Sequence, residues 1–196
     1  MTARRGLAVL AILALAALVA VGVAQLPHSS SSGGGTRLGG AQIRVLLAGS
    51  PAPLAALHAQ GGVLLEGGAS AFQQRLAALK GYPVVVNKWA SWCVPCKEEF
   101  AAFQRVSAEY GRRVAFIGID SADPDRAEAV AFLKSFSVSY PSYYDKSGTL
   151  GLRLTDSTAT PATVFIPPHG APEIIQGEYP SAAKLRRDVE RYALHA

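Results

Sequence analysis

Residues 84–100, which read VVVNKWASWCVPCKEEF, decide the fold of this chain. The stretch opens on a β-branched apolar run typical of a buried strand and continues into a helical pattern that extends to Tyr110. Between them lie Cys93 and Cys96, the two cysteines of the sequence. The start of a helix presents unpaired N–H groups and the positive end of the macrodipole. Because this field stabilises a thiolate, the reactive form of cysteine, the stretch indicates thiol redox chemistry.

Toward the N-terminus the pattern is less regular. The apolar pieces at residues 43–47 and 63–65 predict one or two short strands. A helix is predicted to begin at Ser70, where Gln73 completes a capping box, and to end at Gly81.

Toward the C-terminus, strand-like and helix-like segments alternate. Residues 114–119 predict a strand, and Asp123 and Pro124 predict the N-cap and first position of the next helix. The remaining predictions are a strand at 142–144, a short helix near Leu150, a hairpin of 163–166 with 173–176, and a last helix at 181–193. This order predicts an α/β fold whose sheet is mixed, because the final hairpin adds antiparallel strands.

Composition limits the class of function. The chain has 196 residues and a formal charge of +5, but Arg4 and Arg5 precede an apolar segment and leave 17 basic and 14 acidic residues. This mild excess contains no basic run, so we expect no nucleic-acid partner. The hydrophobic content of 49% is ample for the core of a single domain.

Residues 6–24 contain no charged side chain. As a helix they would reach about 29 Å, close to the thickness of a bilayer core. The arginines before the segment favour a cytoplasmic N-terminus and an extracytoplasmic remainder. We favour a retained single-pass anchor in the cell membrane over a cleaved signal peptide, whose apolar core is usually shorter. Both alternatives export the domain.

The domain boundaries follow from this reading. Residues 1–26 are predicted to be the cytoplasmic stub and membrane anchor, 27–40 a flexible linker rich in Ser and Gly, and 41–196 the folded domain. A linker of this composition spans about 20 Å, so an anchored domain would work close to the membrane.

The block WASWCVPC at residues 89–96, the segment Thr160–Pro161 before a strand, and the apolar N-terminal segment together resemble the thioredoxin superfamily. The similarity is strongest to its membrane-tethered TlpA/ResA/CcmG-type thiol-disulfide oxidoreductases. It covers roughly residues 51–192. It implies a thioredoxin fold, with a central mixed sheet flanked by helices and an N-terminal transmembrane helix.

The resemblance also implies roles for individual residues. Cys93 would be the exposed nucleophile and Cys96 the more buried resolving thiol. Pro161 would be a cis-proline beside the disulfide, and Thr160 would offer backbone groups to an extended substrate. Trp92 and Pro95 would contact substrate, and no cofactor beyond the Cys93–Cys96 disulfide is implied.

Three further positions are open to more than one interpretation. Glu99 is either a proton-handling carboxyl near the cysteines or a solvated residue of the first helical turn. Asn87 stands where thioredoxins have a buried aspartate, and an amide cannot exchange a proton. Lys88 either lies near the active site and favours the thiolate or, as we favour, reaches the surface past the supporting Trp89.

Other chemistries fit the residues less well. No further cysteine is present to complete a zinc site, and haem attachment would need a histidine where Lys97 stands. A structural disulfide and a peroxidase are also disfavoured. A copper chaperone holding Cu(I) between Cys93 and Cys96 remains an alternative, since soft thiolates suit that ion.

We therefore expect an extracytoplasmic enzyme that exchanges disulfides with cysteine-containing proteins. A reductant of the cytochrome c maturation type is favoured, with an oxidant that introduces disulfides as the alternative. Such an enzyme would need a membrane thiol electron donor or acceptor.

Overall fold

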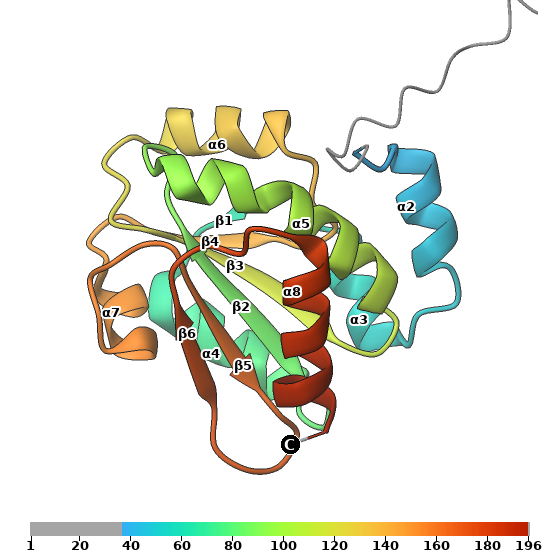
Figure 1. Ribbon diagram of the computed structural model, residues 1–196. Helices are drawn as coiled ribbons and strands as arrows, with labels where there is room; N and C mark the ends of the chain where they lie inside the picture. Colours follow the sequence, from blue (N-terminus) through green and yellow to red (C-terminus); the bar gives the residue numbers. More distant parts are fainter. Residues whose placement is uncertain (1–36, 196) are drawn as a thin grey trace, which may run out of the picture. The chain divides into compact units, whose positions relative to one another are not determined.

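Strand β2 (Val84–Trp89) is an inner strand of the sheet in a computed structural model, which describes residues 37–195. The described residues form a six-stranded sheet in the order β1-β4-β3-β2-β5-β6 (Figure 1). All six residues of β2 are buried, as expected for a strand covered on both faces. The other strands are β1 (Leu64–Leu65), β3 (Ala115–Ser121), β4 (Ser142–Asp145), β5 (Ala162–Ile166) and β6 (Glu173–Gln176).

The sheet is mixed, as predicted. Strands β1, β4, β3 and β2 run parallel, whereas β5 lies antiparallel to β2 and β6 antiparallel to β5. The hairpin predicted near the C-terminus is therefore confirmed. Because β2 pairs with β3 on one side and β5 on the other, its carboxyl end lies between two further segments of chain.

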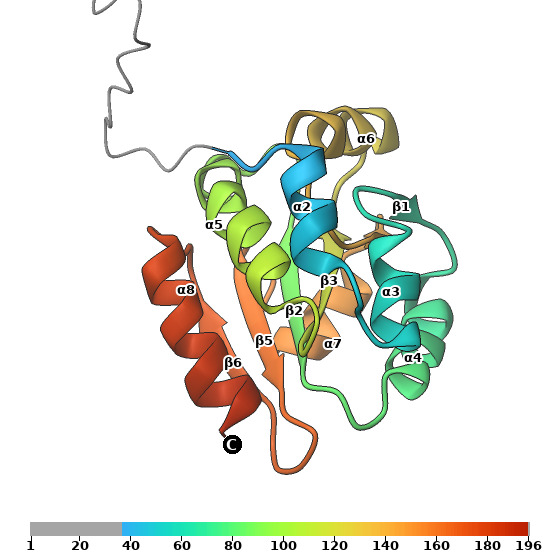
Figure 2. The same ribbon diagram turned by 90° about the vertical axis from the view of Figure 1, so that its right-hand side faces the viewer.

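Helices cover both faces of the sheet (Figures 1 and 2). One face carries α5 (Val94–Tyr110), α6 (Arg126–Ser135) and α8 (Ala182–Asp188), which continues as the π-helical segment η1 (Val189–Leu194). The other carries α3 (Ala52–His58), α4 (Gly68–Ala78) and α7 (Thr149–Thr155). Helix α2 (Gly40–Leu47) lies against α5. This arrangement is a thioredoxin-like fold.

Alternation along β2 divides the core into two clusters, one on each face of the sheet. Val85 and Trp89 belong to the α5 side, and Val84 and Val86 to the α4 side. The Trp89 ring stacks on Phe132 at 4.7 Å between centroids, and its Nε1 donates to Ser142 Oγ. Trp89 therefore anchors the end of β2 through aromatic packing with Phe132 and Phe100.

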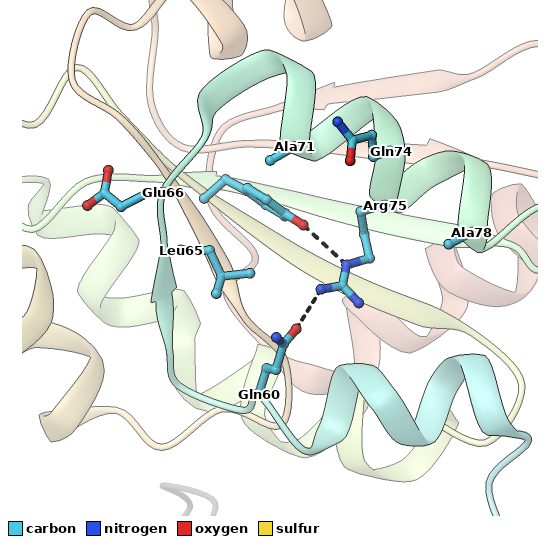
Figure 3. A pocket seen from close by; sticks show the side chains of 8 residues that line it. Gln60, Leu65, Glu66, Ala71, Gln74, Arg75 and Ala78 are labelled. Carbon is cyan, nitrogen blue, oxygen red and sulfur yellow. Dashed lines mark hydrogen bonds between the residues drawn. The ribbon is translucent and has the colours of Figure 1, made fainter.

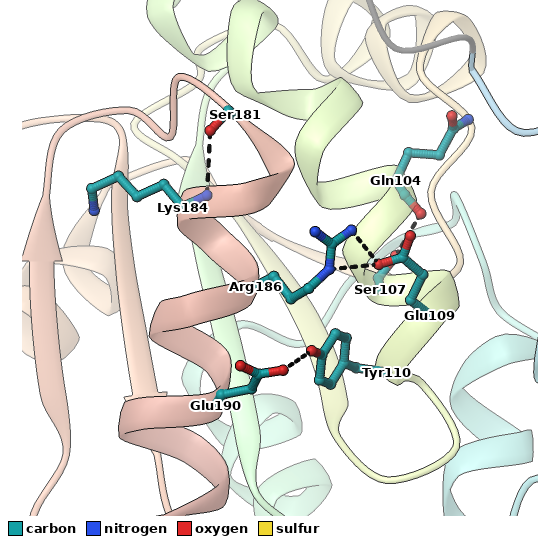
Figure 4. A network of polar contacts seen from close by, with 8 residues as sticks. All are labelled: Gln104, Ser107, Glu109, Tyr110, Ser181, Lys184, Arg186 and Glu190. Atoms are coloured by element: carbon teal, nitrogen blue, oxygen red, sulfur yellow. Dashed lines mark hydrogen bonds and ion pairs between the residues drawn. The ribbon is translucent and has the colours of Figure 1, made fainter.

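Polar contacts tie α5 to the C-terminal helix (Figure 4). The guanidinium of Arg186 donates through Nε and Nη2 to Glu109 Oε2 at 3.1 and 2.7 Å, and the Tyr110 hydroxyl donates to Glu190. A half-exposed pair of this kind contributes about 0.2–1 kcal/mol. These contacts hold the C-terminal half of α5, at the opposite end from the cysteines.

The prediction of a strand at residues 43–47 is wrong, because these residues belong to helix α2. A short apolar run has no periodicity that separates a strand from a helix. Leu47, the buried residue of α2, packs near Gly111 at the end of α5. The strand predicted at 63–65 is confirmed as β1, and a second unpredicted helix, α3, precedes it.

The predicted capping box at Ser70 is also wrong. Helix α4 begins at Gly68, with Gly67 as its N-cap at φ 99°. A Cβ at Gly67 would lie 2.6 Å from the Cβ of Ala71, so glycine suits this left-handed start. Ser70 lies inside the helix, where its hydroxyl accepts from Gln74.

The predicted anchor at residues 1–26 and most of the predicted linker lie outside the described residues. Within residues 37–195, no helix combines the length and the apolar character that crossing a membrane requires.

Candidate active site

Cys93 is the N-cap of helix α5, and Cys96 lies in its first turn. The backbone N–H of Cys96 donates to Cys93 Sγ at 3.2 Å. The two sulfurs form a disulfide with an Sγ–Sγ distance of 2.06 Å. One of the unpaired N–H groups of the helix start is thus aimed at the Cys93 sulfur, the geometry that favours a thiolate there.

Both cysteines are buried in this disulfide form. Cys93 is 3% exposed and Cys96 is fully buried, so the expectation of an exposed Cys93 sulfur is wrong for the oxidised state. Trp92 and Val94, the chain neighbours of Cys93, are 56% and 62% exposed. An apolar rim therefore surrounds a sulfur that is itself nearly covered.

The Thr160–Pro161 peptide bond is cis, which confirms the expectation. The carbonyl oxygen of Thr160 lies 3.7 Å from Cys93 Sγ. Strand β5 begins directly after Pro161 and runs antiparallel to β2, with Ala162 opposite Lys88. This pairing brings Thr160 beside the cysteines. Pro95, in the first turn of α5, is half-buried next to them.

Glu99 is fully buried on α5, three residues after Cys96, so the alternative of a solvated carboxylate is wrong. Its Oε2 accepts from the backbone N–H of Tyr179 at 3.0 Å, and its Oε1 has no partner among the described residues. Burial raises the pKa of Glu99 to about 8, although the Tyr179 N–H acts in the opposite direction. Glu99 is thus neutral at pH 7 and able to exchange a proton near that pH.

Asn87 is buried on the same face of β2 as Trp89, directly opposite Thr163 of β5. Neither its amide nor the Thr163 hydroxyl has a hydrogen-bond partner among residues 37–195, and the same holds for the Tyr140 hydroxyl. Burial raises the pKa of Tyr140, the nearby Asn87 amide acts in the opposite direction, and Glu99 adds a smaller rise. A pocket of polar atoms therefore lies inside the core on the side of α5 that carries Glu99.

Lys88 is buried, so the surface path that we favoured from the sequence is wrong. It lies on the opposite face of β2 from Trp89, so it does not reach the surface past that ring. Its Nζ donates to Thr155 Oγ1 at 3.2 Å and to the Ser157 carbonyl at 2.6 Å. Burial lowers the pKa of Lys88, opposed by the nearby Asp145 charge. Lys88 thus braces the loop that leads to Thr160.

Asp123 is not the cap of α6, because Asp125 caps this helix by accepting from the N–H groups of Ala127 and Glu128. Asp123 Oδ2 instead accepts from the backbone N–H of Ser91 at 2.7 Å. In the same loop the carbonyl of Ala122 accepts from Trp92 Nε1 at 3.2 Å. The loop after β3 therefore supports the loop that carries Cys93, a role no local pattern suggested.

Asp120, at the end of β3, is a second residue that sequence reasoning missed. Its side chain is fully buried, and neither carboxylate oxygen accepts a hydrogen bond within the described part of the chain. Burial, followed by the neighbouring Asp123 and then Asp145, raises the pKa of Asp120 to about 8. One feature of the sequence could have indicated Asp120, because it is an acidic residue that directly follows an apolar strand-like run.

A separate pocket of about 360 Å³ lies between β1 and α4 (Figure 3). The Arg75 guanidinium lines this pocket and donates to the Tyr143 hydroxyl at 3.1 Å and to the Gln60 side-chain oxygen. None of the predicted site residues lines this pocket. This pocket therefore lies apart from the redox site.

Comparison with known proteins agrees with this geometry. Residues 49–171 match the AhpC/TSA family. The chain is 35% identical over 104 residues to "Thiol-disulfide oxidoreductase ResA" of Oceanobacillus iheyensis, which covers 53% of this chain and 54% of that protein. It is 38% identical over 84 residues to "Thiol:disulfide interchange protein DsbE" of Escherichia coli K12, with 42% and 43% covered. The chain thus spans about half the length of these curated relatives.

Solved structures show the same architecture. A DsbF homologue from Corynebacterium diphtheriae superposes with a TM-score of 0.54 at 28% identity, covering 59% of this chain and 75% of that one. A secreted Mycobacterium tuberculosis disulfide oxidoreductase, at 24% identity and a TM-score of 0.52, supports the fold. Since the matched family segment includes the strand, the cysteine pair and the cis-proline, this chain belongs to the AhpC/TSA family, with a thioredoxin-like fold.

Proposed function

We propose that this protein is a thiol-disulfide oxidoreductase that uses Cys93 and Cys96. The observation that carries the proposal is the placement of Cys93 at the start of α5, where the Cys96 N–H donates to its sulfur. A thiolate at this position is stabilised by the hydrogen bond and by the helix dipole. The printed names of the ResA and DsbE relatives support the same activity.

In the reducing direction, the Cys93 thiolate attacks one sulfur of a substrate disulfide. A Cys93–substrate bond forms, the substrate disulfide breaks, and the other substrate sulfur leaves as a thiolate that takes up a proton. Cys96, after losing its proton, then attacks the Cys93 sulfur and releases the second substrate thiol. Two electrons pass to the substrate, and the protein is left with its Cys93–Cys96 disulfide.

Substrate would be held by the residues around Cys93. The Thr160 carbonyl, 3.7 Å from Cys93 Sγ, is placed to accept from the backbone of an extended substrate segment. Pro161 has no N–H and would form an inert wall beside the sulfurs. The half-buried Pro95 and the exposed Trp92 complete this surface.

Glu99 is the candidate proton-transfer group for Cys96, and its ionised form would accept the Cys96 proton. The carboxyl lies three residues further along the same helix, on the buried side, and titrates near pH 8. Asn87 lies in the same part of the core but has no proton to exchange. A general base of this kind contributes about 10²–10⁴-fold to a proton-transfer step.

The apolar segment at residues 6–24 supports an extracytoplasmic domain tethered to the membrane. Its partners would be cysteine-containing proteins and a membrane thiol electron donor, as in cytochrome c maturation.

The reduction potential of the Cys93–Cys96 pair tests the direction of electron flow. We expect a value well below about −180 mV, the range of a reductant, measured by equilibration with glutathione redox buffers. A potential near about −120 mV would instead identify an oxidant that introduces disulfides.

Trp92→Ala is expected to weaken substrate docking with little effect on folding. Removing an exposed aromatic anchor from an interface costs about 2 kcal/mol, so kcat/KM should fall about thirtyfold. Since the ring is more than half exposed, the free energy of unfolding should change by less than about 1 kcal/mol. Turnover of a protein disulfide and urea unfolding check the two parts, and an unchanged kcat/KM would contradict the docking role.

A further inference from the structure

Lys88 reaches from β2 to the chain on both sides of the cis peptide bond. Its Nζ donates to the Ser157 carbonyl at 2.6 Å and to Thr155 Oγ1 at 3.2 Å. The Lys88 backbone lies opposite Ala162, the first residue of β5, in the antiparallel register. The side chain of Lys88 therefore holds the chain before Thr160–Pro161, and its backbone holds the chain after it.

Residues 156–159, between α7 and Thr160, form an exposed segment. Asp156, Thr158 and Ala159 are exposed, and the Ala159 N–H donates within the segment, to Ser157 Oγ. A cavity of about 110 Å³ is lined by Thr158 and Lys88 among others. Because side chains do not fill this space, the segment has room to shift. The bond from Lys88 to the Ser157 carbonyl thus joins an exposed segment to a buried inner strand.

The Thr155 hydroxyl cannot take the place of Lys88 at this carbonyl. Thr155 Oγ1 lies 2.9 Å from the Gly151 carbonyl and 3.0 Å from the Ser157 carbonyl. A hydroxyl has one proton to share between these two acceptors, whereas an ammonium has three. A charged donor also forms the stronger hydrogen bond. Lys88 is therefore the main donor to Ser157.

The same strand positions the attacking sulfur. Residues 90–92 join the end of β2 to Cys93, and the Thr160 carbonyl oxygen lies 3.7 Å from Cys93 Sγ. One strand thus determines both positions: that of Cys93 through the chain that leaves its end, and that of Thr160 through the Lys88 side chain.

We propose that Lys88 is a positioning residue for substrate binding: by holding the Ser157 carbonyl, it places the Thr160 carbonyl where an extended substrate segment can pair with it beside Cys93. The proposal rests on the proposed function, in which Cys93 attacks and Thr160 accepts from substrate. Lys88 is 1% exposed, so it acts through the segment and does not touch substrate. Its loss should weaken the binding of a peptide backbone and leave the reactivity of Cys93 unchanged.

The test compares two probes that share a leaving group, in full-length reduced protein carrying Cys96→Ser. One probe is a short peptide whose cysteine forms a mixed disulfide with thionitrobenzoate, and the other is dithiobis(nitrobenzoate), which has no peptide backbone. In both, the Cys93 thiolate attacks, a new disulfide to Cys93 forms, and thionitrobenzoate leaves with the electron pair as a coloured thiolate. Stopped-flow absorbance gives the half-saturating peptide concentration, the limiting rate, and the rate with the second probe.

Lys88→Met keeps the aliphatic stem and removes the donating Nζ. The half-saturating peptide concentration should rise roughly three- to tenfold, as expected for one misplaced hydrogen bond, while the limiting rate and the rate with dithiobis(nitrobenzoate) stay within about twofold. Thr155→Val, which removes the other group that contacts Nζ and the Ser157 carbonyl, should raise the same concentration. Lys80→Met, at an exposed lysine, is the matched control and should change neither probe.

An unchanged half-saturating peptide concentration in Lys88→Met would overturn the positioning role. An equal loss with both probes would also overturn it, because Lys88 would then act on Cys93 or on the whole fold. Urea unfolding checks that each variant is folded, and should Lys88→Met not fold, Thr155→Val carries the same test with the same contradictory outcomes. Failure of the parent protein to react through Cys93 with either probe would instead refute the proposed function.

Discussion

The Cys96→Ser variant should accumulate mixed disulfides with substrate proteins, whereas Cys93→Ser should form none and lose activity to the level of the uncatalysed reaction. Cys93 receives the Cys96 N–H at the start of α5 and lies beside the exposed rim of Trp92 and Val94. Cys96 is fully buried beneath it, so it can attack Cys93 but not an incoming protein. Without Cys96 the first covalent bond forms and cannot be resolved.

Non-reducing electrophoresis followed by mass spectrometry measures this result. The bands should disappear on reduction, and the double variant Cys93→Ser/Cys96→Ser should give none. The backbone N–H of residue 96 is retained in Cys96→Ser, so the contact that stabilises the Cys93 thiolate is preserved. Trapping through Cys96 in the Cys93→Ser protein would reverse the assignment of nucleophile and resolving thiol.

Glu99→Gln should flatten the dependence of stability on pH by about 1.4 kcal/mol per pH unit between pH 5 and pH 8. Burial raises the pKa of Glu99 from an ordinary value of 4.5 to about 8. The folded protein therefore keeps a proton that the unfolded chain releases, and the contribution of Glu99 to stability is lost as pH rises through this window. Glutamine is neutral throughout and can still accept from the Tyr179 N–H.

Urea unfolding of the oxidised protein, followed by tryptophan fluorescence, measures the difference, because Trp89 is buried against Phe132. The variant should gain stability relative to wild type as pH rises, by up to about 4 kcal/mol at pH 8. Glu98→Gln, an exposed neighbour on the same helix, should leave the slope unchanged. Parallel wild-type and Glu99→Gln curves would show that Glu99 ionises normally.

Much of the fold could be predicted from local sequence patterns. The all-buried β2, the helix after the cysteines and the C-terminal hairpin were predictable because each has a strong period or a clear turn. Residues 43–47 were not, since a five-residue apolar run fits either a strand or a turn of helix. The Asp123–Pro124 pair has the pattern of a helix start. In the structure, however, the Asp123 carboxylate accepts from the distant backbone N–H of Ser91.

The sequence by itself determined the reactive pair and its place between a strand and a helix, which depend on residue type and on spacing along the chain. The proline beside the pair was implied by the resemblance to the thioredoxin superfamily. Only the tertiary structure decided that burial raises the pKa of Glu99 and of Asp120, that Lys88 braces the loop before Thr160, and that the loop after β3 supports Cys93. The physical reason is that burial and neighbouring charge set the ionisation of a side chain, and both arise from tertiary contacts, such as those that join Ser91 with Asp123 and Tyr179 with Glu99.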